Sequence, residues 1–128
     1  MTVETPLPAP HRVVYHNNGG PAGDQGYFGR LLNSLRNHLA AVPGAEIVIV
    51  CHAGGLDLFE RAGDDESLRA ELEALRVAGV RFLVCANTLA TRGLVVSDLA
   101  VVGEQDVVPS GVAELAARQH AGFAYIHL

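Results

Sequence analysis

One stretch decides the fold: Val80-Arg81-Phe82-Leu83-Val84-Cys85-Ala86-Asn87-Thr88, followed directly by Leu89-Ala90-Thr91-Arg92-Gly93. Its apolar run predicts a buried strand that ends at Cys85 and turns straight into a short helix. A thiol at the carboxyl end of a strand, facing the first free N–H groups of a helix, is placed to ionise to a thiolate. Cys85 is therefore the first candidate for a catalytic residue.

Strands and helices alternate on both sides of this stretch. Apolar or β-rich runs predict further strands at residues 12–15, 47–51 and 123–128, with a short one at 101–102 or 107–108. Helical spacing of apolar residues and helix-ending glycines predict helices over residues 23–42, 56–61, 64–79 and 110–120. This alternation is typical of an α/β fold in which a parallel sheet lies between two layers of helices.

Residues 12–128 are expected to form a single domain, preceded by an extended lead-in over residues 1–11 that carries three prolines. Ligands of open parallel sheets bind beyond the carboxyl ends of the strands. This rule gathers four loops at one edge, namely residues 16–20, 52–55, 85–88 and 109–111. We expect the functional site at that edge.

Composition excludes several classes of function. The net charge of −5 argues against a nucleic-acid partner. All nine basic residues are arginines, which excludes Schiff-base chemistry on lysine and a Walker-type phosphate loop. No apolar run approaches the ~18 to 20 residues of a membrane span, and the N-terminus lacks the pattern of a signal peptide. Two cysteines make no disulfide framework, so we expect a cytoplasmic protein with reduced thiols and no membrane partner.

Polar residues follow Cys85 within about two helical turns. Asn87, Thr88 and Arg92 are candidate donors to its sulfur. The competing interpretation is that Cys85 is a small buried apolar residue, as most free cysteines are. The spacing to Arg92 excludes the phosphatase and rhodanese loops, in which an arginine lies closer to the cysteine.

Other candidates lie at the same predicted edge. Cys51 also ends a strand, so it is either a resolving partner of Cys85 or a core residue. His16 and His52 each begin a loop and are candidate proton carriers. Ser110 is a helix cap whose hydroxyl can also face the edge. Because no compact metal-binding spacing is present, we expect neither a metal nor a cofactor.

Five segments, in this order along the chain, resemble the DsrE/DsrF-like family. They are Val13-Val14-Tyr15-His16-Asn17, Gly55-Leu56-Asp57-Leu58, Gly79-Val80-Arg81-Phe82, Cys85-Ala86-Asn87-Thr88-Leu89 and Val107-Val108-Pro109-Ser110-Gly111-Val112-Ala113-Glu114-Leu115. The resemblance covers about residues 12–128 and is closest to stand-alone, largely uncharacterised members. It implies a three-layer α/β/α sandwich with a five-stranded, mainly parallel sheet, assembled into trimers or hexamers.

The resemblance also implies a function. Better-known relatives are sulfur-relay subunits in which a cysteine after the third strand carries a persulfide and precedes an Arg-Gly pair. Cys85 and Arg92-Gly93 occupy the matching positions, whereas Cys51 matches no family motif. The leading hypothesis is a sulfur carrier or sulfurtransferase that passes sulfane sulfur from Cys85 to a sulfur-acceptor protein. The alternatives are a non-catalytic oligomeric module that binds a ligand or protein, and a metal-binding redox sensor.

Overall fold

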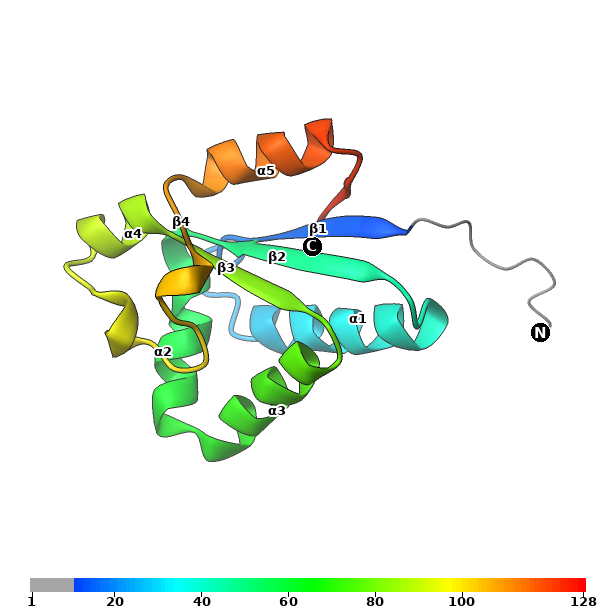
Figure 1. Cartoon of the computed structure of the whole chain (residues 1–128). Coiled ribbons are helices and arrows are strands. Elements are labelled where there is room, and N and C mark those ends of the chain that lie inside the picture. The colour runs from blue at the N-terminus through cyan, green and yellow to red at the C-terminus, as the bar shows by residue number, and fades with distance from the viewer. Residues whose placement is uncertain (1–10) are drawn as a thin grey trace, which may run out of the picture.

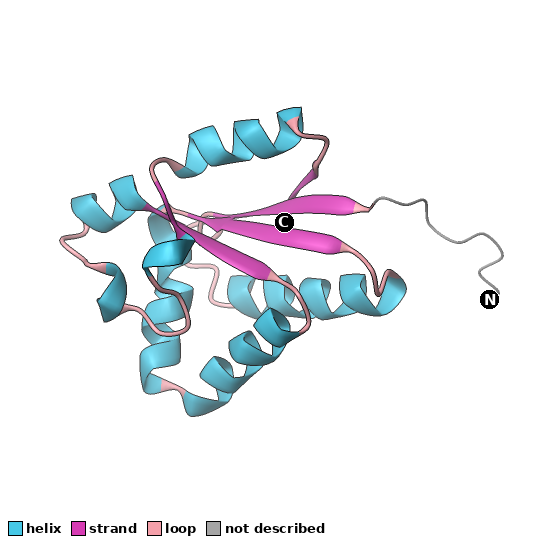
Figure 2. Ribbon diagram, viewed as in Figure 1, coloured by secondary structure: helices cyan, strands magenta, loops and turns pink. Residues whose placement is uncertain are grey.

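A five-stranded sheet lies between two layers of helices in the computed structural model of this protein, which describes residues 11–128 (Figure 1). One helix, α5 (Gly111–His120), covers one face of the sheet, and the helices α1, α2 and α3 cover the other (Figure 2). The predicted three-layer α/β/α sandwich is therefore confirmed. Residues 1–10 of the predicted lead-in lie outside the described residues.

All strand pairs in the sheet are parallel, and the strand order is β4-β3-β2-β1-β5. The strands are β1 (Arg12–Asn17), β2 (Glu46–Cys51), β3 (Arg81–Cys85), β4 (Val107–Val108) and β5 (Ala124–His127). Of the two segments predicted for the short fourth strand, residues 107–108 form it. The β1–β5 pairing joins the two ends of the domain. Because all five strands are parallel, the carboxyl ends of β5, β1, β2, β3 and β4 lie at one edge of the sheet.

The remaining helices connect these strands. They are α1 (Tyr27–Ala41), α2 (Asp57–Asp64), α3 (Glu66–Val77) and α4 (Ala86–Thr91), with 3₁₀ turns at Ala53–Leu56, Val96–Asp98 and Glu104–Asp106. The prediction that the first helix begins near residue 23 is wrong, because Pro21 to Gly26 form turns in which Gly23 has φ +81°. No helix in the described residues is long and apolar enough to cross a membrane.

The two faces of the sheet have separate cores, because successive side chains of a strand point to opposite faces. On β2, Val48 and Val50 pack beneath α5 together with Leu115 of that helix. Ile49 and Cys51 point the other way, into the larger core against α1, α2 and α3. A residue at the end of a strand therefore reaches one helical layer or the other according to its register alone.

Candidate functional site

Cys85 is the last residue of β3 and the N-cap of α4. Its register partner is Val108 of β4, and it follows Leu83 by two residues, so its side chain lies on the same face of the sheet as α5. The residue is only 4% exposed. The sequence therefore placed this thiol correctly, at the carboxyl edge and at the start of a helix.

Four donors converge on the Cys85 sulfur. Burial alone would raise the pKa of the Cys85 thiol. Hydrogen bonds from the backbone N–H groups of Gly111, Thr88 and Asn87, and from the Thr88 hydroxyl, outweigh it, so the pKa falls below its ordinary value. The Asn87 and Thr88 donors belong to the first turn of α4, where N–H groups have no helical partner. The site thus favours the nucleophilic thiolate.

Gly111, which the sequence did not single out, supplies the donor from a second helix. It is the first residue of α5, and the Ser110 hydroxyl caps that helix by accepting the Ala113 N–H at 3.2 Å. A Cβ atom at position 111 would lie 3.2 Å from the Cβ of His52 and 3.4 Å from that of Cys85. A side chain at position 111 would therefore be tightly packed against His52 and Cys85, and the Pro109-Ser110 helix start was the one available signal.

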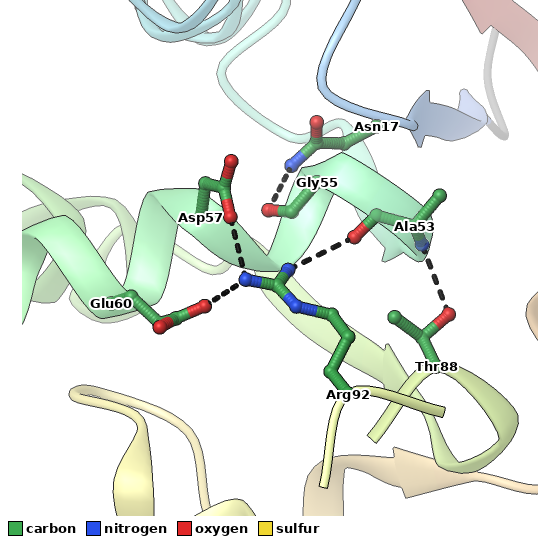
Figure 3. Close-up of polar contacts among 7 residues, drawn as sticks. All are labelled: Asn17, Ala53, Gly55, Asp57, Glu60, Thr88 and Arg92. Carbon is green, nitrogen blue, oxygen red and sulfur yellow. Dashed lines mark hydrogen bonds and ion pairs between the residues drawn. The ribbon is translucent and has the colours of Figure 1, made fainter. Parts of the chain in front are cut away.

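Thr88 links Cys85 to the loop after β2. Its Oγ1 accepts the Ala53 N–H at 3.0 Å (Figure 3). The hydroxyl proton of Thr88 therefore remains available to the Cys85 sulfur. Ala53 has φ 49°, in the left-handed region that a side chain disfavours. This strained residue is held by hydrogen bonds on both its N–H and its carbonyl group, the latter from Arg92.

Arg92 does not donate to Cys85, contrary to the expectation from sequence. Its guanidinium donates to the Ala53 carbonyl at 3.3 Å, to Asp57 at 2.8 Å and to Glu60 (Figure 3). The cause is its position at the end of α4, beside the two carboxylates in the first turn of α2. Arg92 therefore connects α4 to α2 and to the loop at Ala53, whose N–H is bound by Thr88.

Cys51 lies on the opposite face of the sheet from Cys85, so the structure does not bring the two thiols together as a resolving pair. It pairs in register with Val84, one residue before Cys85, and this offset turns its side chain into the core against α1, α2 and α3. Burial raises the pKa of Cys51 to about 12, although the Asn17 amide donates to its sulfur at 3.4 Å. Both cysteines are free thiols.

The two predicted histidines do come together, and they are joined by two residues that sequence reasoning missed. His16 Nε2 lies 2.5 Å from His52 Nε2, and His16 Nδ1 lies 2.6 Å from the Tyr125 hydroxyl. The His16 ring stacks on His52 and on His127, with 4.7 Å between centroids in each case. His127 is exposed at the surface, and the β1–β5 pairing brings it beside His16.

Burial and the neighbouring imidazoles favour the neutral form of His16 and of His52. Burial, then His52 and then His127 lower the pKa of His16 to about 4. Burial, then His127, lower the pKa of His52 as well. Within residues 11–128 no group of three or more His, Cys, Asp or Glu side chains is arranged to hold a metal ion.

Comparison with known proteins agrees with this architecture. The model of the DsrE/DsrF-like family matches residues 11–128. A solved structure of MTH1491, a protein of unknown function from Methanobacterium thermoautotrophicum, is 33% identical and superposes with a TM-score of 0.77. The match covers 92% of this chain and 99% of MTH1491. No curated protein matches.

The family match spans nearly the whole chain, in agreement with the five segments that carried the resemblance in sequence. The family is associated with sulfur relay. Because the family model matches residues 11–128 and MTH1491 shares the fold, this chain belongs to the DsrE/DsrF-like family.

Proposed function

We propose that this protein is a sulfur carrier, with a sulfurtransferase-like activity, in which Cys85 accepts sulfane sulfur as a persulfide. One observation carries the proposal: Cys85 is the N-cap of α4 and lies against Gly111 at the start of α5, and the N–H groups of these two helix starts lower the pKa of its thiol. Their partial positive charge favours an anionic sulfur. Membership of the DsrE/DsrF-like family supports the same chemistry.

Transfer takes two exchange steps of the same kind. The Cys85 thiolate attacks the sulfane sulfur of a donor, a new S–S bond forms, and the donor's bond to that sulfur breaks with the electron pair leaving on the donor. An acceptor thiolate then attacks the outer sulfur of the persulfide, and Cys85 leaves as a thiolate. The donors around Cys85 stabilise it as nucleophile in the first step and as leaving group in the second.

The proposal extends to the setting of the protein. A persulfide carrier needs reduced thiols, so we place it in the cytoplasm with an acceptor protein as partner. The family resemblance suggests a homo-oligomer, a trimer or hexamer. Large apolar side chains that stay exposed in the described residues, Val112 and Tyr125 among them, support a covered surface. Native mass spectrometry gives the subunit count directly.

Intact-protein mass spectrometry after incubation with polysulfide tests the sulfur-carrier role. Wild type and Cys51→Ser are expected to gain one or more sulfur masses that dithiothreitol removes. Cys85→Ser is expected to gain none. If wild type gains no sulfur, the proposal fails, and if only Cys51→Ser loses the gain, the carrier is Cys51.

A second candidate function is a non-catalytic module in which Cys85 only packs, and the 4% exposure of this residue favours it. An acceptor must reach the outer sulfur, so a thiol that stays closed to reagents in the native protein cannot carry sulfur. Native alkylation of Cys85 therefore separates the two functions.

A further inference from the structure

Three imidazoles and the Cys85 thiol form a row along one face of the sheet. His16 is in register with His127 on β5 and with Val50 on β2, and Val50 packs beneath α5. His16 and His127 therefore lie on the α5 face. His52, which directly follows β2, comes within 3.4 Å of the Cβ position of Gly111, which also neighbours Cys85. The order across the strand ends is His127, His16, His52, Cys85. We call these three imidazoles the histidine row.

A hydrogen-bonded chain within the histidine row leaves donors at its ends. It runs from the Tyr125 hydroxyl through both ring nitrogens of His16 to His52 Nε2. In a neutral chain each contact uses one proton, so one end, the Tyr125 hydroxyl or His52 Nδ1, remains a donor. Uptake of one further proton makes both ends donors and gives the chain a positive charge.

No carboxylate neutralises that charge within the described residues. None of the ion pairs among the described residues involves His16, His52 or His127. The two acids of the first turn of α2, Asp57 and Glu60, are paired with Arg92. His52 of the histidine row lies against Gly111, the first residue of α5. The N-terminus of that helix is a further source of positive potential. The whole strand-end edge around Cys85 thus favours an anion.

We propose that the histidine row, with Tyr125, binds the oxyanion of the sulfur donor, and that the donor class is therefore a sulfane sulfur bonded to a sulfonate, as in thiosulfate. This inference rests on the proposed function of Cys85. The Cys85 thiolate attacks the outer sulfur of thiosulfate, the S–S bond of thiosulfate breaks, and sulfite leaves with the electron pair. The products are the Cys85 persulfide anion and sulfite, so atoms and charge balance and no oxidant is needed.

The test compares two donors on the same protein. Initial rates of sulfur loading onto Cys85 are measured by intact mass with thiosulfate and with polysulfide, which has no oxyanion, and sulfite release is measured in parallel. In His16→Gln and His52→Gln the ratio of thiosulfate to polysulfide rates is expected to fall about tenfold or more, the loss of one charge-assisted hydrogen bond. His120→Gln, at the far exposed end of α5, is the matched control.

A second readout does not depend on transfer. In Cys85→Ser, thiosulfate is expected to shift the imidazole Cε1–H resonances of the histidine row and to leave that of His120 in place. If wild type loads from polysulfide but not from thiosulfate, the inference is overturned and the carrier function stands. Equal slowing with both donors overturns it in favour of a proton-carrying role. If neither donor loads wild type, the carrier function fails. If thiosulfate also leaves the imidazole resonances of the histidine row unshifted, the anion site itself is overturned.

Discussion

Cys51 and Cys85 end neighbouring strands of one sheet, yet the structure gives them opposite chemistry. Both are almost fully buried, at 0% and 4% exposure, so accessibility does not distinguish them. The register does: Cys51 pairs with Val84, and the one-residue offset sends the two side chains to opposite faces.

The consequence is a difference in hydrogen-bond donors. Cys51 meets an apolar core and one amide, and burial raises its pKa to about 12. Cys85 meets the starts of two helices, whose N–H groups bring its pKa below the ordinary value in spite of burial. What surrounds a buried thiol, more than how far it is buried, decides whether it is reactive.

The largest expected effect is a difference in alkylation rate between Cys85 and Cys51, which tests their contrast directly. At pH 7, iodoacetamide is expected to modify Cys85 in the native protein at least about 100-fold faster than Cys51, because the thiolate is the reacting form. The Cys85 rate should fall as pH drops through its pKa, since its thiolate is lost. Peptide mapping after timed quenching measures both rates. Equal rates, or Cys51 reacting first, would remove the physical basis for Cys85 as carrier.

Asn17, which donates to the Cys51 sulfur, allows a test of the Cys51 environment. Its fully buried amide donates to the Gly55 carbonyl at 3.1 Å and to Cys51, and its Oδ1 accepts the Gly19 N–H at 3.1 Å. Asn17→Ala leaves buried partners unpaired and is expected to lower the free energy of unfolding by about 2–3 kcal/mol in urea titrations. Asn33→Ala, on the exposed side of α1, is the control. A loss of equal size in both would contradict this assignment.

The smallest effect concerns Arg92. Because its ion pairs with α2 are partly exposed, Arg92→Met is expected to lower the free energy of unfolding by no more than about 1 kcal/mol. The guanidinium does not contact the sulfur, so the Cys85 alkylation rate should stay within about twofold of wild type. Arg36→Met, which breaks an exposed pair with Glu71, serves for comparison. A large rise in the pKa of Cys85 in Arg92→Met would show that the arginine acts on the thiolate after all.

Most of the fold follows from local sequence patterns. Strands such as β2 and β3 are unbroken apolar runs bounded by Gly and polar residues, and alternation with helices fixes a parallel sheet. The helix start near residue 23 was misjudged because the periodic apolar pattern begins only at Phe28, and Pro21 to Gly26 before it form turns.

The site was only partly predictable, for a physical reason. Cys85, Asn87 and Thr88 are neighbours in sequence, so the start of α4 explains their contact. Gly111 and His127 reach the site only through the order of the strands, which no local pattern encodes. Arg92 was assigned to the sulfur because its spacing fits, whereas in the structure its guanidinium pairs with two carboxylates of α2.

The β1–β5 pairing has a further consequence, for the order of folding. Val13 pairs with Ala124, so this contact closes a loop of roughly 110 residues, whereas β1–β2 and β2–β3 close much shorter ones. We expect the three inner strands and their helices to assemble first and β5 to dock late. His127 and Tyr125 belong to β5. A chain in which β5 has not yet docked therefore has Cys85 in place but an incomplete histidine row. On this expectation the proposed anion site is completed only when β5 docks.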